Sequence, residues 1–171
     1  MGVTVHFKGR LLGTSAFDEV IRLGRDLASE LKSTATIIDN PKATLLRVHD
    51  NEQPWDYVGA VKGIEVQLHP NADPLRLEFD EDLYIQEYVK TQFAGVDVHV
   101  RLAGFLHDIA PFFVELIVDD EGEYYETGDV GRLRELLDWC SRAIEKEITE
   151  DPTLYGPIRG PDGRVIDLMK R

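Results

Sequence analysis

The stretch from residue 64 to residue 79 constrains the fold more than any other part of the chain. In residues 64–68, and again in residues 75–79, apolar and polar side chains alternate. This is the period of a strand with one buried face. The sequence between them, Pro70-Asn71-Ala72-Asp73-Pro74, has the composition of a turn. Two alternating runs joined by a short turn predict a β-hairpin, and therefore an antiparallel sheet.

Three other stretches repeat apolar side chains at the spacing of one helix face. They predict helices over residues 15–32, from Asp97 to Pro111, and from Asp129 to residue 148. Asp129 precedes the last stripe at the position where a carboxylate caps a helix. Gly24 lies within the first stripe and costs helix stability unless close packing requires it.

Helices combined with an antiparallel hairpin favour the α+β class over a doubly wound parallel sheet. We expect residues 1–150 to form a single two-layer domain, mainly an antiparallel sheet with about three helices on one face. Residues 151–171 are rich in Pro and Gly. They are expected to form a C-terminal tail, or a hairpin around the turn sequence Pro161-Asp162-Gly163.

Four further regions give weaker local signals. We predict that Asp39-Asn40-Pro41 ends one strand, and that the polar residues 49–60 form a loop. Residues 82–95 fit either a strand or a helix. His99 and His107 are interpreted as members of a solvated helix face. His6 alternates with Val5 and Phe7, so it is expected to point outward, or to line a pocket on that face of the sheet.

The charge of the chain is concentrated in one block. The formal net charge is −13, from 32 Asp+Glu and 19 Lys+Arg. Counted from the sequence, residues 1–77 carry −1, residues 78–151 carry −14 and residues 152–171 carry +2. An acidic surface repels phosphate, which disfavours nucleic acids and anionic membranes as partners. A basic protein partner, or a salty solvent that screens the charge, remains compatible with it.

Other features exclude further classes. No apolar run approaches the length of about 20 residues that crosses a bilayer, and the first residues do not resemble a secretory signal. The one cysteine, Cys140, cannot form an internal disulfide and falls on an apolar helix stripe. We therefore expect a cytoplasmic protein. Phosphate-cradle, dinucleotide, zinc-protease and nucleophile-elbow motifs are absent, so neither catalytic residues nor a cofactor is assigned.

The most acidic segment, residues 119–129, holds six acids in eleven residues together with two tyrosines. Its spacing does not fit a calcium-binding EF-hand loop. Tyrosine is enriched in protein interfaces, and a second aromatic pair lies in the polar segment 49–60. The candidate partner-binding residues are Asp119, Asp120, Glu121, Glu123, Tyr124, Tyr125, Glu126, Trp55 and Tyr57.

The leading hypothesis is a non-catalytic acidic module that binds a basic protein partner, such as an inhibitor of a basic enzyme. Two alternatives stay open. One is a metal-dependent hydrolase, because imidazoles and carboxylates cluster loosely in residues 49–73 and together suit a divalent metal. Its candidate ligands are His49, Asp50, Asp56, His69 and Asp73. The other is a protein that binds a small ligand in a pocket lined by aromatics such as Tyr84, Tyr88, Phe93 and Phe105.

Overall fold

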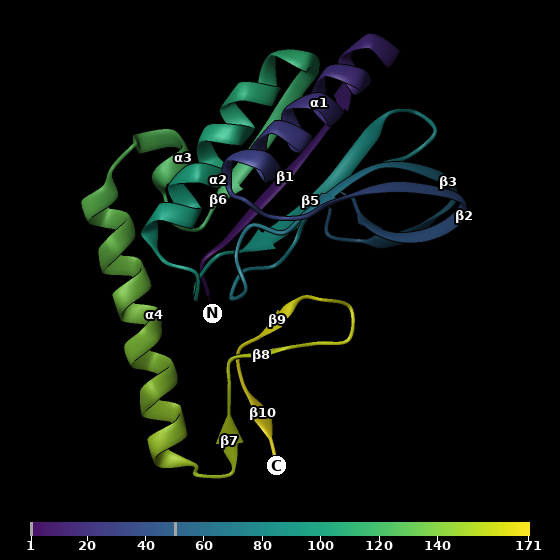
Figure 1. Ribbon diagram of the computed structural model, residues 1–171. Coiled ribbons are helices and arrows are strands. Elements are labelled where there is room, and N and C mark those ends of the chain that lie inside the picture. Colours follow the sequence, from purple (N-terminus) through teal and green to yellow (C-terminus); the bar gives the residue numbers. More distant parts are fainter. Residues whose placement is uncertain (1, 50) are drawn as a thin grey trace.

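Two three-stranded antiparallel sheets form the centre of the molecule, with strand orders β5-β1-β6 and β2-β3-β4 (Figure 1). The computed structural model describes residues 2–49 and 51–171. Along the chain the elements are β1 (Thr4–Leu11), α1 (Thr14–Glu30), β2 (Ala35–Val48), β3 (Pro54–Val66), β4 (Leu75–Phe79), β5 (Tyr84–Lys90), α2 (Val96–Ile109), the 3-10 turn η1 (Ala110–Phe112), β6 (Phe113–Asp120), α3 (Tyr124–Thr127), α4 (Val130–Glu150), β7 (Leu154–Tyr155), β8 (Ile158–Arg159), β9 (Val165–Ile166) and β10 (Met169–Lys170). The predicted α+β class is confirmed.

The predicted hairpin is β3 and β4. Ile64 lies opposite Leu77 and Val66 opposite Leu75, and all four side chains are buried. The alternation in the sequence therefore reflects one face turned into the core, as a half-buried strand requires.

The helices α1 and α2 cover one face of the β5-β1-β6 sheet (Figure 1). Val5 and Phe7 of β1 join the core cluster that also contains Val20 of α1 and Leu102 of α2. Gly24 allows the close approach of α1 to the other sheet, since an added Cβ would lie 3.1 Å from Ile64 Cγ2.

The helix α4 begins where the sequence predicts. The side chain of Asp129 accepts a hydrogen bond from the backbone N–H of Arg132, which satisfies one of the free donors of the first turn. Only the first half of α4 is buried, through Leu133, Leu137 and Cys140. The second half extends away from the sheets (Figure 1).

Two strand boundaries were predicted wrongly. β2 does not end at Asp39-Asn40-Pro41 but continues through a bulge between Asn40 and Ala43. Proline is tolerated there because β2 is an edge strand. The predicted loop 49–60 is also mostly strand, since β3 begins at Pro54. The part of the β2–β3 ribbon near the connection between the two strands is mostly exposed. Its side chains therefore do not alternate between apolar and polar, and the sequence gives no strand signal there.

The ambiguous residues 82–95 form β5, and the interpretation of His99 as solvated was wrong. His99 is fully buried between α2 and the end of β6. His107 is exposed, as predicted, and its ring stacks on the Tyr125 ring with ring centroids 3.9 Å apart. A polar residue on an amphipathic helix is usually exposed, and His99 departs from this because buried hydrogen-bond partners meet both of its ring nitrogens.

The tail after residue 151 forms two short ladders, β7 with β10 and β8 with β9. The hairpin β8–β9 turns at Pro161-Asp162-Gly163, as the turn sequence predicts. It is tied to the rest of the molecule by Val165, whose backbone N–H donates to Asp73 Oδ1 at 2.7 Å. Among the described helices, none has the length and apolarity that crossing a membrane requires.

Candidate functional site

The face of the β5-β1-β6 sheet opposite the helices forms the floor of a groove. Because β1 pairs with β5 on one side and β6 on the other, two rows of side chains cross the sheet there. One row is Tyr88, His6 and Asp119, and the next is Gln86, Lys8 and Ile117. The expectation that His6 points away from Val5 and Phe7 is confirmed, and its side chain lines this groove.

The end of β2 forms one wall of the groove. The side-chain amide of Gln86 donates to the Val48 carbonyl at 2.9 Å and accepts from the Val48 N–H at 2.6 Å. A side chain thus completes the backbone hydrogen bonding of an edge strand. Arg47 is buried beside it and donates to the carbonyls of Gln86 and Tyr84. These contacts fix the wall against the floor.

The tail hairpin β8–β9 forms a second boundary through Asp162 and Arg164. The whole groove holds about 1080 Å³. Arg76 of β4 connects the hairpin to the sheets, since it donates to the Asp162 carbonyl and pairs with Glu65 at 2.7 Å. Residues from both ends of the chain therefore meet in one cavity.

Two carboxyl groups near the tail side of the groove are hard to ionise. Burial raises the pKa of Glu78 above its ordinary value, although Arg76, Arg164 and Arg47 act to lower it. Burial likewise raises the pKa of Glu87, against the influence of Arg164. A further positive charge placed in the groove would stabilise the ionised form of each carboxyl group.

The charges that line the groove are unevenly compensated. Arg47, Arg76 and Arg164 each lie within 4.0 Å of a carboxylate of the protein itself. Within residues 2–49 and 51–171, three lining acids have no ion pair and no side-chain hydrogen bond: Glu52, Glu78 and Asp119. Three acids that line the groove are thus left without a direct ionic partner among the described residues.

The predicted acidic segment 119–129 is divided between surface and interior. Asp119 is exposed in the groove, but the neighbouring Asp120 side chain is buried. Asp120 accepts hydrogen bonds from His99 Nε2 and from the backbone N–H groups of Gly122, Tyr124 and Tyr125. This carboxylate holds the segment in shape and is not accessible to a partner.

Most of the other members of the segment bind neighbours within the protein. Glu121 accepts from the Thr4 N–H and lies 3.9 Å from His6 Nε2, next to the groove. Glu123 pairs with Arg132, and Glu126 is exposed. The two aromatic rings pack on histidines, Tyr124 on His99 and Tyr125 on His107.

Trp55 and Tyr57 lie in β3 and not in a loop. The Trp55 ring stacks on His49, which lines the groove, with ring centroids 5.5 Å apart. The Tyr57 hydroxyl donates to the Ala60 carbonyl. Trp55 therefore lies behind one rim of the groove and Asp119 lies on its floor, so the geometry connects two of the predicted partner-binding regions.

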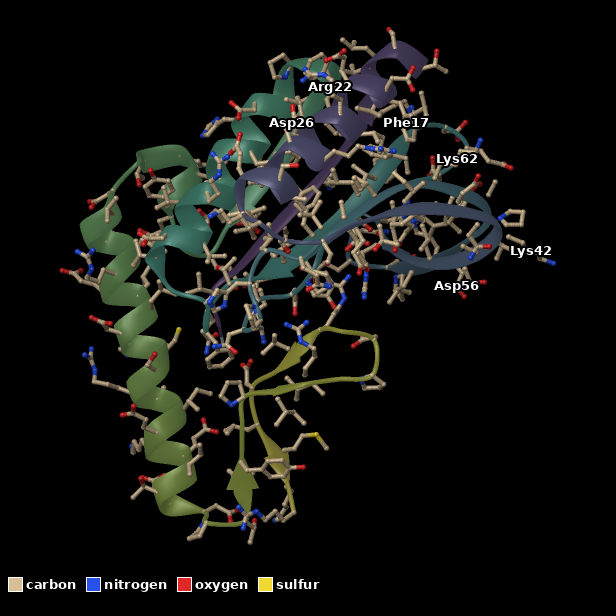
Figure 2. The ribbon with its side chains drawn as sticks, in the orientation of Figure 1. Phe17, Arg22, Asp26, Lys42, Asp56 and Lys62 are labelled. Carbon is tan, nitrogen blue, oxygen red and sulfur yellow. The ribbon has the colours of Figure 1, made fainter. Side chains whose placement is uncertain are left out.

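The structure separates the predicted metal ligands. His49 follows Val48 at the groove wall, and Asp56 lies opposite Leu46 in the β2–β3 ribbon, where Figure 2 labels it. His69 and Asp73 follow the other end of β3, and Asp73 lies beside Lys90, about 13 Å along β5 from the Gln86 that binds Val48. Asp73 is buried and binds the Lys90 and Val165 N–H groups, and His69 Nδ1 accepts from Asn71. Asp50 lies outside the described residues. Elsewhere in the described chain, no three His, Cys, Asp or Glu side chains gather as a metal site would require.

Several groove residues were missed by sequence reasoning, notably Glu78, Gln86, Glu87 and Arg164. The alternation in β1 indicated an open sheet face, but the pairing of β1 with distant strands was not readable from local pattern. Of the aromatics suggested for a small-ligand pocket, Tyr88 lines the groove and Phe105 is part of the core.

No protein-family model matches this chain, and no curated protein or solved structure matches it either.

Proposed function

We propose that the protein is a non-catalytic binding module, and that its groove receives a basic segment of a partner protein. The observation that supports this most directly is that Glu52, Glu78 and Asp119 line the groove without a direct ion pair in the described chain, while each of its three arginines contacts another carboxylate. A cation placed there gains Coulomb energy in a partly desolvated setting.

Exposed apolar side chains beside these acids favour a polypeptide over a free metal ion. Leu46 is 69% exposed, Ile117 48% and Tyr88 42%, and all three line the groove. An extended segment with alternating basic and apolar side chains would cover them while its cations meet the carboxylates. A basic enzyme blocked by such contact is one partner that fits, which makes the inhibitor role part of the proposal.

The proposal includes a cytoplasmic location. Cys140, the one cysteine of the chain, is unpaired and buried in α4. A chain without disulfides suits a reducing compartment.

The test is fluorescence anisotropy with a labelled short peptide of alternating arginine and valine, against an otherwise equal peptide of glutamate and valine. We expect the basic peptide to bind, and the double variant Glu78→Gln with Asp119→Asn to weaken its binding about tenfold, because two groove charges are removed.

The matched control removes the same two charges elsewhere. Glu145 and Glu147 are exposed on the second half of α4 and their side chains make no ion pair within the described chain. The variant Glu145→Gln with Glu147→Gln should bind like the wild type. Equal losses in the two double variants, or equal binding of the acidic peptide, would refute the groove as a site for basic segments.

A further inference from the structure

The tail hairpin inserts one arginine into a fully formed guanidinium site at the edge of the groove. Arg164 Nη1 donates to the Tyr88 carbonyl at 3.0 Å, and Nη2 donates to Glu87 Oε2 at 2.9 Å. The guanidinium carbon lies 3.9 Å from the centre of the Tyr88 ring. Asp73 Oδ2 is 3.6 Å from Nη1. The arginine side chain is 16% exposed, so the site encloses most of it.

Every group that holds this guanidinium belongs to the body of the protein. Glu87 and Tyr88 are in β5, and Asp73 precedes β4. Arg164 comes from the tail, more than seventy residues later in the chain. A carbonyl, a carboxylate and an aromatic face are the three kinds of group that recognise a guanidinium most specifically. The site is thus complete without the tail and is occupied by it.

We infer that this is an arginine-recognition subsite of the groove, that Arg164 occupies it as an internal ligand, and that an arginine of the basic partner competes with Arg164 for it. The inference rests on the proposed function, since it assumes that a basic segment enters the groove. It specifies that the groove recognises an arginine side chain of the partner. It also gives a reason why the free protein binds that arginine weakly, since Arg164 already occupies the subsite.

The geometry selects arginine over lysine. A planar guanidinium can stack on Tyr88 and donate to Glu87 and to the Tyr88 carbonyl at the same time. An ammonium group is a compact charge without a plane, so it cannot make the stacked and forked contacts together.

The tether makes Arg164 a strong competitor for the subsite, which restrains but does not prevent binding of a partner arginine. An attached ligand acts at a high effective concentration, which lowers the apparent affinity for a free competitor without any change in the site. One contact outside the hairpin keeps the tail nearby when the arginine leaves and the hairpin lifts from Asp73, namely the Lys90–Asp167 pair at 2.6 Å.

The test compares full-length variants with the same labelled arginine–valine peptide. Arg164→Gln vacates the subsite, and Arg171→Gln removes one tail arginine that lies over Tyr155, outside the groove lining. We expect Arg164→Gln to bind the peptide roughly fivefold or more tightly than the wild type, and Arg171→Gln to bind as the wild type does. A lysine–valine peptide should gain less from Arg164→Gln than the arginine peptide.

A second measurement uses the wild-type protein and does not depend on a variant that folds. Amide hydrogen exchange of Val165 reports whether the hairpin stays on Asp73. Saturation with the arginine peptide should accelerate this exchange.

The outcomes separate the two proposals. If the wild type binds the peptide but Arg164→Gln binds equally or more weakly, or Val165 exchange is unchanged at saturation, the subsite inference is overturned and the groove proposal stands. If neither the wild type nor Arg164→Gln binds the peptide, both proposals fail.

Discussion

His99 Nε2 in α2 lies 3.0 Å from Asp120 Oδ2 at the end of β6, and both side chains are buried. Since a carboxylate only accepts, Nε2 donates to Asp120, and Nδ1 is hydrogen-bonded to the Thr91 hydroxyl at 2.7 Å. Three segments distant in sequence are joined by these two hydrogen bonds. Because the His99 and Asp120 side chains are buried and Asp120 also accepts from three backbone N–H groups, the arrangement fixes the acidic segment next to the groove.

Asp120→Ala should lower the free energy of unfolding by about 3 kcal/mol, because a buried histidine and three backbone N–H groups lose their acceptor. Asp119→Ala is the control, since the neighbouring side chain is exposed, and should change stability by less than about 0.5 kcal/mol. Urea unfolding of both variants measures the difference. Similar losses would mean that the buried network contributes little.

Glu78→Gln should make the protein more stable at neutral pH while weakening its binding of the basic peptide. Burial raises the pKa of Glu78 above the ordinary value of 4.5, so ionisation opposes folding. The cost is absent below that value and develops as the pH rises through the raised pKa. The variant removes the ionisation and with it the cost.

Urea unfolding of Glu78→Gln across a pH series tests this sign. We expect the variant and the wild type to converge at acidic pH, where Glu78 is protonated in both the folded and unfolded states. Glu145→Gln, at an exposed position, should follow the wild type throughout. A Glu78→Gln protein that is less stable than the wild type at neutral pH would contradict the expected cost of ionisation.

Two glycines inside helices should respond oppositely to alanine. An added Cβ at Gly104 of α2 meets no atom within 4 Å, so Gly104→Ala should stabilise by about 1 kcal/mol through helix propensity. At Gly24 of α1 the Cβ would press on Ile64 in the core. Gly24→Ala should therefore destabilise by about 1 kcal/mol, as overpacking outweighs propensity. Thermal unfolding of the two variants measures both changes in stability. A stabilising effect of both substitutions would show that the Ile64 side chain moves to make room for the added methyl group.

Arg47→Ala should cost about 3 kcal/mol, because the buried guanidinium joins β2 to the carbonyls of Tyr84 and Gln86. Arg47 also lies over the Tyr84 ring, and Arg10 approaches that ring from an exposed position. Arg10→Ala should change stability by less than about 0.5 kcal/mol. Urea unfolding distinguishes the pair. A small effect of Arg47→Ala would imply that the groove wall is held by Gln86 and Val48 without it.

Much of the secondary structure followed from local pattern. The buried alternation of Ile64 and Val66, the apolar stripe around Val20 and the Asp129 cap each depend on residues close together in the chain. Prediction from the sequence failed where the local pattern of apolar and polar residues does not indicate burial or pairing. Trp55 lies in a strand exposed on both sides, and His99 is buried only because Thr91 and Asp120 meet it there.

The sequence by itself determined the β3–β4 hairpin, the three long helices and the excess of negative charge in residues 78–151. Only the tertiary structure decided where that charge is available. Placing β1 between β5 and β6 brings His6, Tyr88 and Asp119 into one row, and folding the tail back carries Arg164 onto Tyr88. Periodicity reports which face of an element is buried, but the partner across a sheet depends on contacts between residues far apart in sequence. For that reason the acidic segment could be predicted from the sequence, whereas the groove beside it could not.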